Sequence, residues 1–205
     1  MHDRPRHYEE FEPRREVVPG APSNVDAFLK WGAEQPEGFR YELSRGLVYK
    51  SMVNVSRAHA LVASNIIFEL MSRLDREKIQ VSAAEFGVQT PFGARMPDIM
   101  VDPGGGPNLE KAAKQPILLV EVLSPSTENV DFTEKLEEYQ AIASLRHYLI
   151  CSQSETKVWL WSRADDVWQG EPDVITDLTG AVVITGLGIE LPMAAIYRKV
   201  RFENQ

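Results

Sequence analysis

A chain of 205 residues, 43% hydrophobic and 25% charged, is long enough for one domain with a substantial buried core. Its net charge of −8 and sequence pI of about 5.1 argue against a surface that binds polyanions everywhere, although a local basic groove is compatible with both. A single cysteine, Cys151, excludes an intramolecular disulfide framework and a cysteine-rich zinc site. The sequence has no long apolar run typical of a membrane helix and no secretory signal at its start, so we expect a cytoplasmic protein.

The chain begins with a segment that lacks the apolar pattern of a folded domain. Residues 1–22 combine Arg, Glu, His and Pro with few aliphatic side chains, which predicts a flexible N-terminal arm. Residues 23–205 are then predicted to form a single domain. Ser23 and Asp26 resemble a helix N-terminal capping box, and the apolar side chains after them predict a short helix that ends at Pro36.

Two strands and a long helix are predicted next. Residues 39–53 alternate between apolar and polar side chains around Arg45 and Gly46, a pattern typical of two strands joined by a turn. Ser56 is predicted to cap a helix that runs to about Arg76, because apolar residues then recur near the helical period. These apolar residues are Leu61, Ile66, Ile67, Leu70, Met71 and Leu74.

The rest of the chain predicts further strands and one more helix. Strands are predicted over residues 79–89, 96–101 and 115–123, and the last of these is the most hydrophobic stretch of the chain, typical of a central strand buried on both faces. A helix is predicted from Asp131 to about Ala143. Short strands are also predicted at 147–151, 157–161, near 174 and at 182–184. This order of elements predicts an α/β fold with a mixed sheet.

Two acidic residues stand inside apolar strands. Glu121 lies in the middle of the most hydrophobic segment, and Asp98 follows Pro97 at the start of another predicted strand. A buried carboxylate normally requires a cation, a hydrogen-bond donor or a metal. A single acid in a strand is more often a salt-bridge partner, but two acids on neighbouring strands would form an oxygen-rich site suited to Mg²⁺ or Mn²⁺.

A lysine on the helix that follows completes this candidate site. Asp131, Lys135 and Tyr139 recur every four residues and therefore lie along one side of the predicted helix. If this helix packs beside the Glu121 strand, Lys135 could orient a water molecule or stabilise the charge that develops on a phosphate. The alternative is that Asp131 caps the helix and Lys135 forms an exposed ion pair.

Several segments in combination resemble the Uma-type family, described as putative restriction endonucleases within the PD-(D/E)xK nuclease superfamily. The resemblance spans roughly residues 23–190. It rests on the motifs Gly38-Phe39-Arg40-Tyr41-Glu42-Leu43-Ser44-Arg45-Gly46, His59, Pro97-Asp98, Val120-Glu121-Val122-Leu123-Ser124-Pro125-Ser126 and Glu134-Lys135-Leu136 with Tyr139.

The resemblance implies a fold and a site. The fold is an α/β (α+β) restriction-endonuclease-like fold, with a mixed central β-sheet flanked by helices. Asp98 would be the aspartate of the PD motif, and Glu121 would occupy the (D/E) position. The superfamily pattern places a lysine at position 123, where this chain has Leu123, so Lys135 would supply the lysine instead.

Other residues are weaker candidates. Glu42 matches an early glutamate of the family and is predicted as a third acid that contacts the metal through water, or else as a strand-end acid paired with Arg40 or Arg45. Glu85 could fill the same role. His59, near a predicted helix start, is either catalytic or a capping or core histidine.

The predicted function is a nuclease that hydrolyses phosphodiester bonds in DNA. One or two Mg²⁺ or Mn²⁺ ions would be held by Asp98, Glu121 and the backbone carbonyl of Val122. A homodimer is expected if both strands of a duplex are cut. A basic groove should then flank the metal site, and its candidate residues are Arg57, Arg95, Lys111 and Lys114.

Two alternatives stay open. A catalytically inactive nuclease-fold module for binding or assembly is favoured by the acidic composition and by Leu123. A hydrolase of small phosphorylated ligands would have a closed pocket in place of an open cleft.

Overall fold

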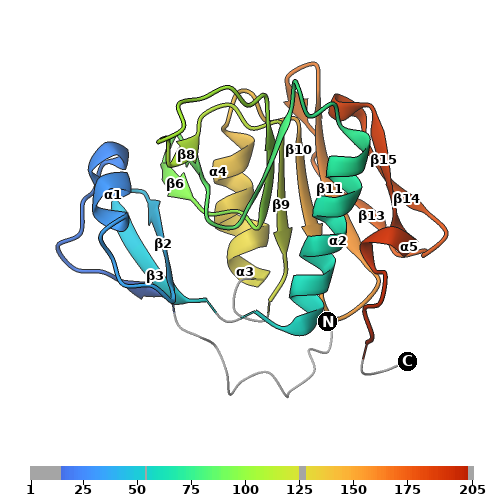
Figure 1. Cartoon of the computed structure of the whole chain (residues 1–205), viewed down its shortest axis with the longest axis horizontal. Helices are drawn as coiled ribbons and strands as arrows, with labels where there is room; N and C mark the ends of the chain where they lie inside the picture. The colour runs from blue at the N-terminus through green and yellow to red at the C-terminus, as the bar shows by residue number, and fades with distance from the viewer. Residues whose placement is uncertain (1–14, 54, 125–127, 203–205) are drawn as a thin grey trace.

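A computed structural model of the chain describes residues 15–53, 55–124 and 128–202. Its main feature is a sheet with the strand order β12-β11-β10-β9-β7-β4, in which β13 also pairs with β11 (Figure 1). The strands of this larger sheet are β4 (Gln80–Ala83), β7 (Ile99–Asp102), β9 (Leu118–Val122), β10 (His147–Cys151), β11 (Val158–Ala164), β12 (Val167–Trp168) and β13 (Asp173–Ile175).

The larger sheet is mixed, and β9 lies at its centre. β9 runs parallel to β10 and antiparallel to β7, and all five of its side chains are buried. The continuous apolar run of the sequence predicted such a strand, and the prediction is confirmed. The expected mixed α+β architecture is confirmed with it.

A second sheet has the order β1-β3-β2-β6-β5-β8. Its strands are β1 (Glu16–Val17), β2 (Phe39–Ser44), β3 (Leu47–Met52), β5 (Gly87–Thr90), β6 (Gly93–Arg95) and β8 (Ala112–Ala113). The predicted hairpin of β2 and β3 is confirmed, and its turn residues Arg45 and Gly46 have φ angles of 50° and 80°. Both angles match a tight hairpin turn whose twist follows that of the strands.

Part of the segment predicted as an arm contacts this second sheet. β1 pairs antiparallel with β3, and the guanidinium of Arg15 lies 3.4 Å from the ring centroid of Tyr49. Residues 1–14 lie outside the described residues, so the arm and the boundary at residue 22 stay predictions.

The helices are α1 (Val25–Gly32), α2 (Arg57–Arg73), α3 (Glu128–Val130), the π-helical turn η1 (Asp131–Lys135), α4 (Leu136–Gln140) and α5 (Met193–Ile196). A 3₁₀ turn, η2 (Thr185–Leu187), joins the strands of the hairpin β14 (Ala181–Ile184) and β15 (Ile189–Pro192). Ser56 caps α2 as predicted, because its side chain accepts a hydrogen bond from the His59 N–H. Asn24, and not Ser23, caps α1. Within the described residues, no helix is both long and apolar enough to cross a membrane.

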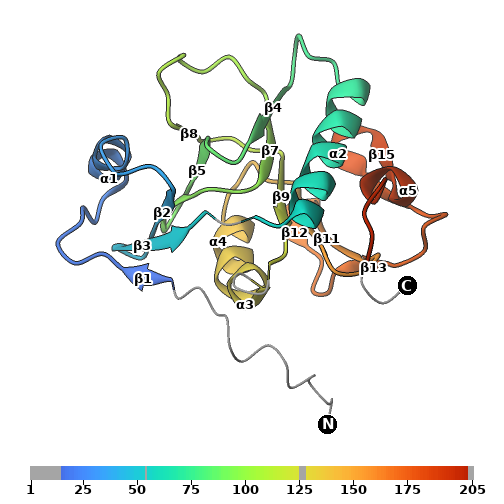
Figure 2. The ribbon, with the colours of Figure 1, turned by 60° about the horizontal axis from the view of Figure 1, so that its bottom comes forward.

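Helices cover both faces of the larger sheet (Figures 1 and 2). On one face, the buried side chains Val62, Ile66 and Leu70 of α2 join a core that includes Val120 of β9. On the other face, Tyr139 of α4 packs with Leu119, Tyr148 and their neighbours. The alternation of side chains along β9 sends Val120 to the α2 face and Leu119 to the α4 face.

The expected strand over residues 79–89 is wrong. The segment forms two strands, β4 and β5, which belong to different sheets and are separated by a turn over residues 84–86. Gly93 opens β6 beside β2. A Cβ atom added to Gly93 would lie 2.0 Å from the Leu43 carbonyl oxygen, so only glycine allows the two strands to approach.

Helix α2 offers a test of the core. Ile66 is fully buried, whereas Phe68 on the same helix is 63% exposed. Ile66→Ala is expected to lower the free energy of unfolding by about 2–5 kcal/mol, because a cavity opens against the sheet. Phe68→Ala should change it by less than about 0.5 kcal/mol. Urea denaturation of both variants measures the difference, and equal effects would contradict this packing.

Candidate active site

Asp98 and Glu121 lie opposite each other where β7 begins. Ile99 pairs with Val120 in the antiparallel ladder, so Asp98, one residue earlier, comes opposite Glu121. The Val122 N–H donates a hydrogen bond of 2.8 Å to Asp98 Oδ2, which joins the two segments at this point. Both acids are buried, with exposed fractions of 5% and 2%. The structure therefore brings the two sequence-predicted acids together on the α4 face of the sheet.

The helical segment 128–140 brings a lysine and a tyrosine to Glu121. Lys135 Nζ and Tyr139 Oη each lie 2.9 Å from Glu121 Oε1. Lys135 Nζ also lies 3.0 Å from Asp131 Oδ1. The alternative of an exposed Lys135 is wrong, because this residue is 3% exposed. Asp131 does not cap the helix either, since the helical segment already begins at Glu128.

The π-helical turn lies within this segment. η1 spans Asp131–Lys135 and continues directly into α4. A π turn inserts one extra residue into a helix and often occurs at functional sites. Here its two ends are the buried acid and the buried lysine that pair with each other.

Glu42 lies beside Lys135, but its main partner is one that the sequence did not suggest. Its Oε1 accepts a hydrogen bond of 3.0 Å from the Met96 N–H, and its Oε2 lies 3.1 Å from Arg95 Nη1. Lys135 Nζ is 3.9 Å from Glu42 Oε1. The expected pairing of Glu42 with Arg40 or Arg45 is wrong, because the partner is Arg95.

Arg95 lies in the interior of the protein and not in a basic groove. Its exposed fraction is 0%, and it binds both carboxylate oxygens of Glu138, at 2.7 Å and 2.9 Å. Glu138 also accepts a hydrogen bond from the Ser44 hydroxyl. The prediction that Arg95 faces nucleic acid is wrong. Sequence reasoning missed Glu138, because nothing in the acidic run of α4 distinguishes it from its neighbours.

Asp98 has two basic neighbours. Arg40 Nη2 lies 3.3 Å from Asp98 Oδ1, and His59 Nε2 lies 3.6 Å from Asp98 Oδ2. Sequence reasoning missed Arg40 as a site residue. Its signal was the strand alternation, which places Arg40 and Glu42 on the same face of β2.

Burial and charge act on the acids in opposite directions. Burial, assisted by Asp131, Asp98 and Glu42, raises the pKa of Glu121 to about 8, although Lys135 opposes the rise. Burial alone would also raise the pKa of Asp98, but the neighbouring His59 and the charge of Arg40 lower it to about 2.

Glu42 and Lys135 remain charged. Burial alone would raise the pKa of Glu42, but Lys135 and Arg95 outweigh it and lower this pKa to about 2. Burial likewise disfavours the charged Lys135, but Asp131, Glu121 and Glu42 raise its pKa. Of Glu42, Asp98 and Glu121, it is thus Glu121 that holds a proton near neutral pH when no further cation is present.

Negative charge exceeds positive charge in this cluster. Its five buried carboxylates are Glu42, Asp98, Glu121, Asp131 and Glu138, and its three cations are Arg40, Arg95 and Lys135. If all were ionised, an excess of two negative charges would remain among these residues. One divalent cation would balance it.

The donor set fits a metal that keeps part of its water shell. Lys135 and Tyr139 both donate hydrogen bonds to Glu121 Oε1. Within the described residues, no hydrogen bond to Glu121 Oε2 is found, so this oxygen is the one that could bind a metal. The same part of the chain contains no group of three His, Cys, Asp or Glu side chains arranged to hold a metal. Two carboxylates with water as the remaining ligands suit Mg²⁺ or Mn²⁺ better than Zn²⁺.

The other sequence candidates lie further out. Glu85 is exposed, in the turn after β4, and lines a surface hollow together with Arg40 and Lys111. Arg57 is exposed at the start of α2, and Lys114 lines a separate hollow. The candidates for the basic groove that are exposed are Arg57, Lys111 and Lys114, but they do not line one common hollow.

The comparisons with known proteins identify a family and agree with this fold. The model of the Uma2 family, described as "putative restriction endonuclease", matches residues 25–194, and the chain belongs to this family. The chain is 25% identical over 182 residues to the uncharacterized protein slr1290 of Synechocystis sp. (strain ATCC 27184 / PCC 6803 / Kazusa). The aligned region covers 86% of this chain and 92% of that protein.

A solved structure has the same fold. The crystal structure of a putative nuclease of DUF820 from Anabaena variabilis ATCC 29413 superposes with a TM-score of 0.66. The match has 18% sequence identity and covers 86% of this chain and 98% of that one.

The ion pair of Arg95 offers a test of the buried network. Arg95→Met is expected to lower the free energy of unfolding by about 3–5 kcal/mol, because Glu138 and Glu42 lose their buried partner. Arg45→Met is the matched control, since Arg45 is half-exposed and pairs with the exposed Glu137, and should cost less than about 1 kcal/mol. A double variant, Arg95→Met with Glu138→Met, should recover part of the loss in thermal denaturation.

The raised pKa of Glu121 predicts a pH-dependent stability. In the folded, metal-free protein Glu121 keeps its proton up to about pH 8, whereas the unfolded chain loses it near the ordinary value of 4.5. The folded state binds more protons in this window, so the contribution of Glu121 to the free energy of unfolding falls as pH rises through it.

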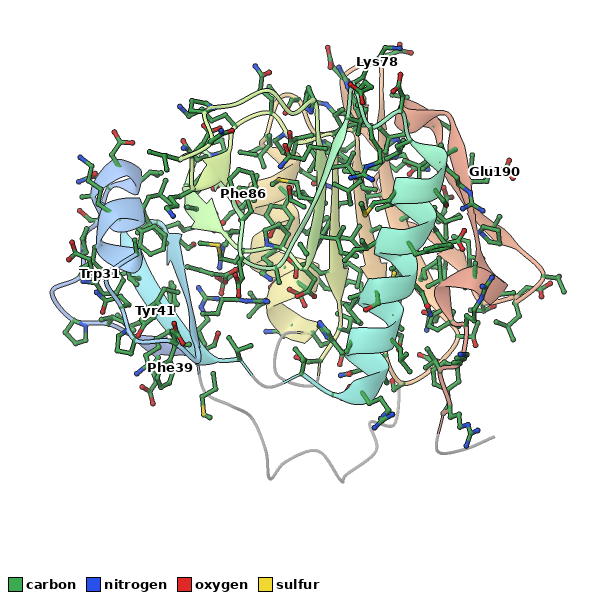
Figure 3. The ribbon with its side chains drawn as sticks, viewed as in Figure 1. Trp31, Phe39, Tyr41, Lys78, Phe86 and Glu190 are labelled. Carbon is green, nitrogen blue, oxygen red and sulfur yellow. The ribbon has the colours of Figure 1, made fainter. Side chains whose placement is uncertain are left out.

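Glu121→Gln removes this fall, because glutamine stays neutral. Relative to wild type, the variant should gain on the order of a few kcal/mol between about pH 5 and pH 8.5, measured by urea denaturation in EDTA. The exposed Glu190→Gln, at the opposite end of the molecule from Trp31 in Figure 3, is the control and should show no such gain. A constant difference across this range would contradict the prediction.

Proposed function

We propose that this protein is a nuclease that hydrolyses phosphodiester bonds in DNA with the help of Mg²⁺ or Mn²⁺. The observation that carries the proposal is the pair Asp98 and Glu121, opposite each other at the β7–β9 ladder with Lys135 2.9 Å from Glu121. The Uma2 family is described as "putative restriction endonuclease" and the Anabaena variabilis protein as a "putative nuclease", and both descriptions support the same class of activity.

Asp98, Glu121 and the Val122 carbonyl are the proposed metal ligands. When bound, a divalent cation supplies a water of lowered pKa and neutralises charge on the phosphate. Glu121 must lose its proton to bind the cation, so affinity should rise with pH up to about 8. Asp98 is already ionised at neutral pH because its pKa is about 2.

Lys135 is proposed to stabilise the charge that develops on the phosphate. Its ammonium is fixed by Asp131 and Glu121, and Glu42 lies 3.9 Å away on a third side. A cation held in place by buried acids requires little rearrangement during the reaction. Tyr139 holds the same oxygen of Glu121 and keeps that carboxylate in one orientation. Leu123 is compatible with activity in this scheme, since the lysine comes from the helix.

A catalytically inactive binding or assembly module is the second candidate. The observation that favours it is the pairing of Asp98 with Arg40 and His59, which supplies positive charge to one of the proposed ligands. A hydrolase of small phosphorylated ligands is the third candidate. Assays of metal binding, oligonucleotide cleavage and phosphomonoester cleavage separate all three. A homodimer is expected if duplex DNA is cut on both strands, and sedimentation of the protein with and without DNA tests it.

The proposed ligands can be tested by substitution. Asp98→Asn and Glu121→Gln are each expected to reduce cleavage of DNA by about 10²–10⁴-fold and to abolish binding of Mn²⁺ in calorimetry. Lys135→Met should reduce cleavage by a similar factor while Mn²⁺ still binds.

Asp102→Asn is the matched control. Asp102 is a buried acid at the end of β7, whereas Asp98 lies just before the start of this strand. Asp102 Oδ1 accepts a hydrogen bond from the Gly104 N–H, away from the site. This variant should cut DNA like the wild type. Wild-type protein that binds Mn²⁺ but cuts no nucleic acid would overturn the nuclease, and the phosphomonoester assay would then decide between the inactive module and the small-ligand hydrolase. Wild-type protein that binds no metal would overturn the proposed site.

A further inference from the structure

A surface hollow lies directly beside the candidate active site. It has a volume of about 690 Å³ and is lined by residues of α1, β2 and the turn over residues 84–86. Arg40 is common to both places, because it lines the hollow and its guanidinium lies 3.3 Å from Asp98 Oδ1. A molecule bound in the hollow would therefore contact the side chain that neighbours a proposed metal ligand.

We propose that this hollow binds one unpaired nucleotide next to the phosphodiester bond that is cut. The inference rests on the proposed nuclease function and adds a substrate class to it, namely nucleic acid with a single-stranded segment. The volume lies within the range of pockets that hold small organic ligands. It is a place for one nucleotide and not for a duplex, whose bases are stacked and paired.

Arg40 and Lys111 are suited to the phosphate of this nucleotide. The two hydrogen bonds from Arg40 to Asp98 measure 3.3 Å and 3.4 Å, longer than the usual 2.7–2.9 Å of charge-assisted hydrogen bonds. The Arg40 side chain is 21% exposed, so it is accessible to a phosphate from the hollow. Lys111 is exposed and also lines the hollow. Because a divalent cation bound to Asp98 would repel Arg40, the arginine would then favour the phosphate.

Two aromatic residues on the opposite face of β2 from Arg40 also line the hollow, and they are suited to the base. Phe39 and Tyr41 line it, and both are only partly buried. Trp31 packs edge-on against Tyr41 at 5.2 Å, and the Lys50 ammonium lies 3.6 Å from the Phe39 ring centroid. Figure 3 shows Trp31, Phe39 and Tyr41 gathered at the end of the molecule that carries α1. The parts of the Phe39 and Tyr41 rings that stay exposed offer surfaces on which an unpaired base can stack, without a requirement for one sequence.

The acidic residues of the hollow limit its occupant. Glu37 and Glu85 also line it and would repel a second phosphate. Their carboxylates can instead accept hydrogen bonds from the N–H groups of a base, including the ring N–H of thymine. The charges thus favour one nucleotide, with its phosphate toward Arg40, over a longer stretch of backbone.

Binding tests this inference separately from cleavage when it is measured in EDTA and again in Mn²⁺ with Lys135→Met protein, which is expected to bind the metal but to cut little. The probe is a fluorescein-labelled 12-nucleotide oligo(dT), titrated with wild-type protein and followed by fluorescence anisotropy. Phe39→Ala and Tyr41→Leu are each expected to weaken binding by about tenfold, because one stacking surface is lost. Phe68→Ala is the matched control, since Phe68 is an exposed phenylalanine on α2, far from α1 in Figure 1, and should bind like the wild type. Thermal denaturation of each variant checks that Tyr41→Leu still folds, and Phe39→Ala carries the test if it does not.

The outcomes separate the two proposals. Oligonucleotide binding that Phe39→Ala weakens, with no cleavage in Mg²⁺ or Mn²⁺, would support the hollow and overturn the nuclease. Cleavage of DNA by the wild type, together with oligonucleotide binding that Phe39→Ala leaves unchanged, would support the nuclease and overturn the nucleotide site in the hollow. Wild-type protein that binds no oligo(dT), or that binds a duplex of the same length equally well and independently of Phe39, would overturn the nucleotide site.

Discussion

The site depends on one constraint, which is that two carboxylates share the end of an antiparallel ladder inside the protein. The pairing of β7 with β9 places Asp98 opposite Glu121, and the Val122 N–H fixes the first acid against the second strand. To turn to solvent, Asp98 would have to give up its hydrogen bond from the Val122 N–H, and Glu121 would have to give up those from Lys135 and Tyr139. The protein must therefore supply positive charge from elsewhere, and most of the neighbouring structure does so.

Positive charge comes to this point from separate parts of the chain. Lys135 reaches it from the helical segment over 128–140, and Arg40 from β2 of the second sheet. Arg95 of β6 binds Glu138 and Glu42, so one buried guanidinium connects that helical segment to the second sheet. The buried charges thus help to hold together the two sheets and the helix between them. Even so, carboxylates outnumber cations here, and this imbalance is the physical reason to expect a metal.

Arg40 connects the proposed metal site with the surface of the protein. Arg40 has Asp98 on one side and the hollow beside α1 on the other. Arg40 and Asp98 pair with each other in the structure. A cation bound to Asp98 would free Arg40 to bind a phosphate, and a phosphate bound to Arg40 would free Asp98 to bind a cation, so each would favour the binding of the other. Metal binding and substrate binding are expected to be coupled through this one side chain, without any movement of the sheet.

The sequence by itself determined the strands and helices that carry the site. An acid inside the apolar run of β9, another after Pro97, and a lysine one turn after Asp131 were visible as patterns, because burial of charge is improbable unless it is compensated. Local patterns also predicted the turn at Arg45 and the cap at Ser56. Only the tertiary structure decided which cation meets which acid. Arg95 looked like a surface residue and is the most buried cation, and the predicted strand over residues 79–89 divides between two sheets. Such pairings join residues far apart in the chain, so they depend on how the sheets pack and leave no periodic signal in the sequence.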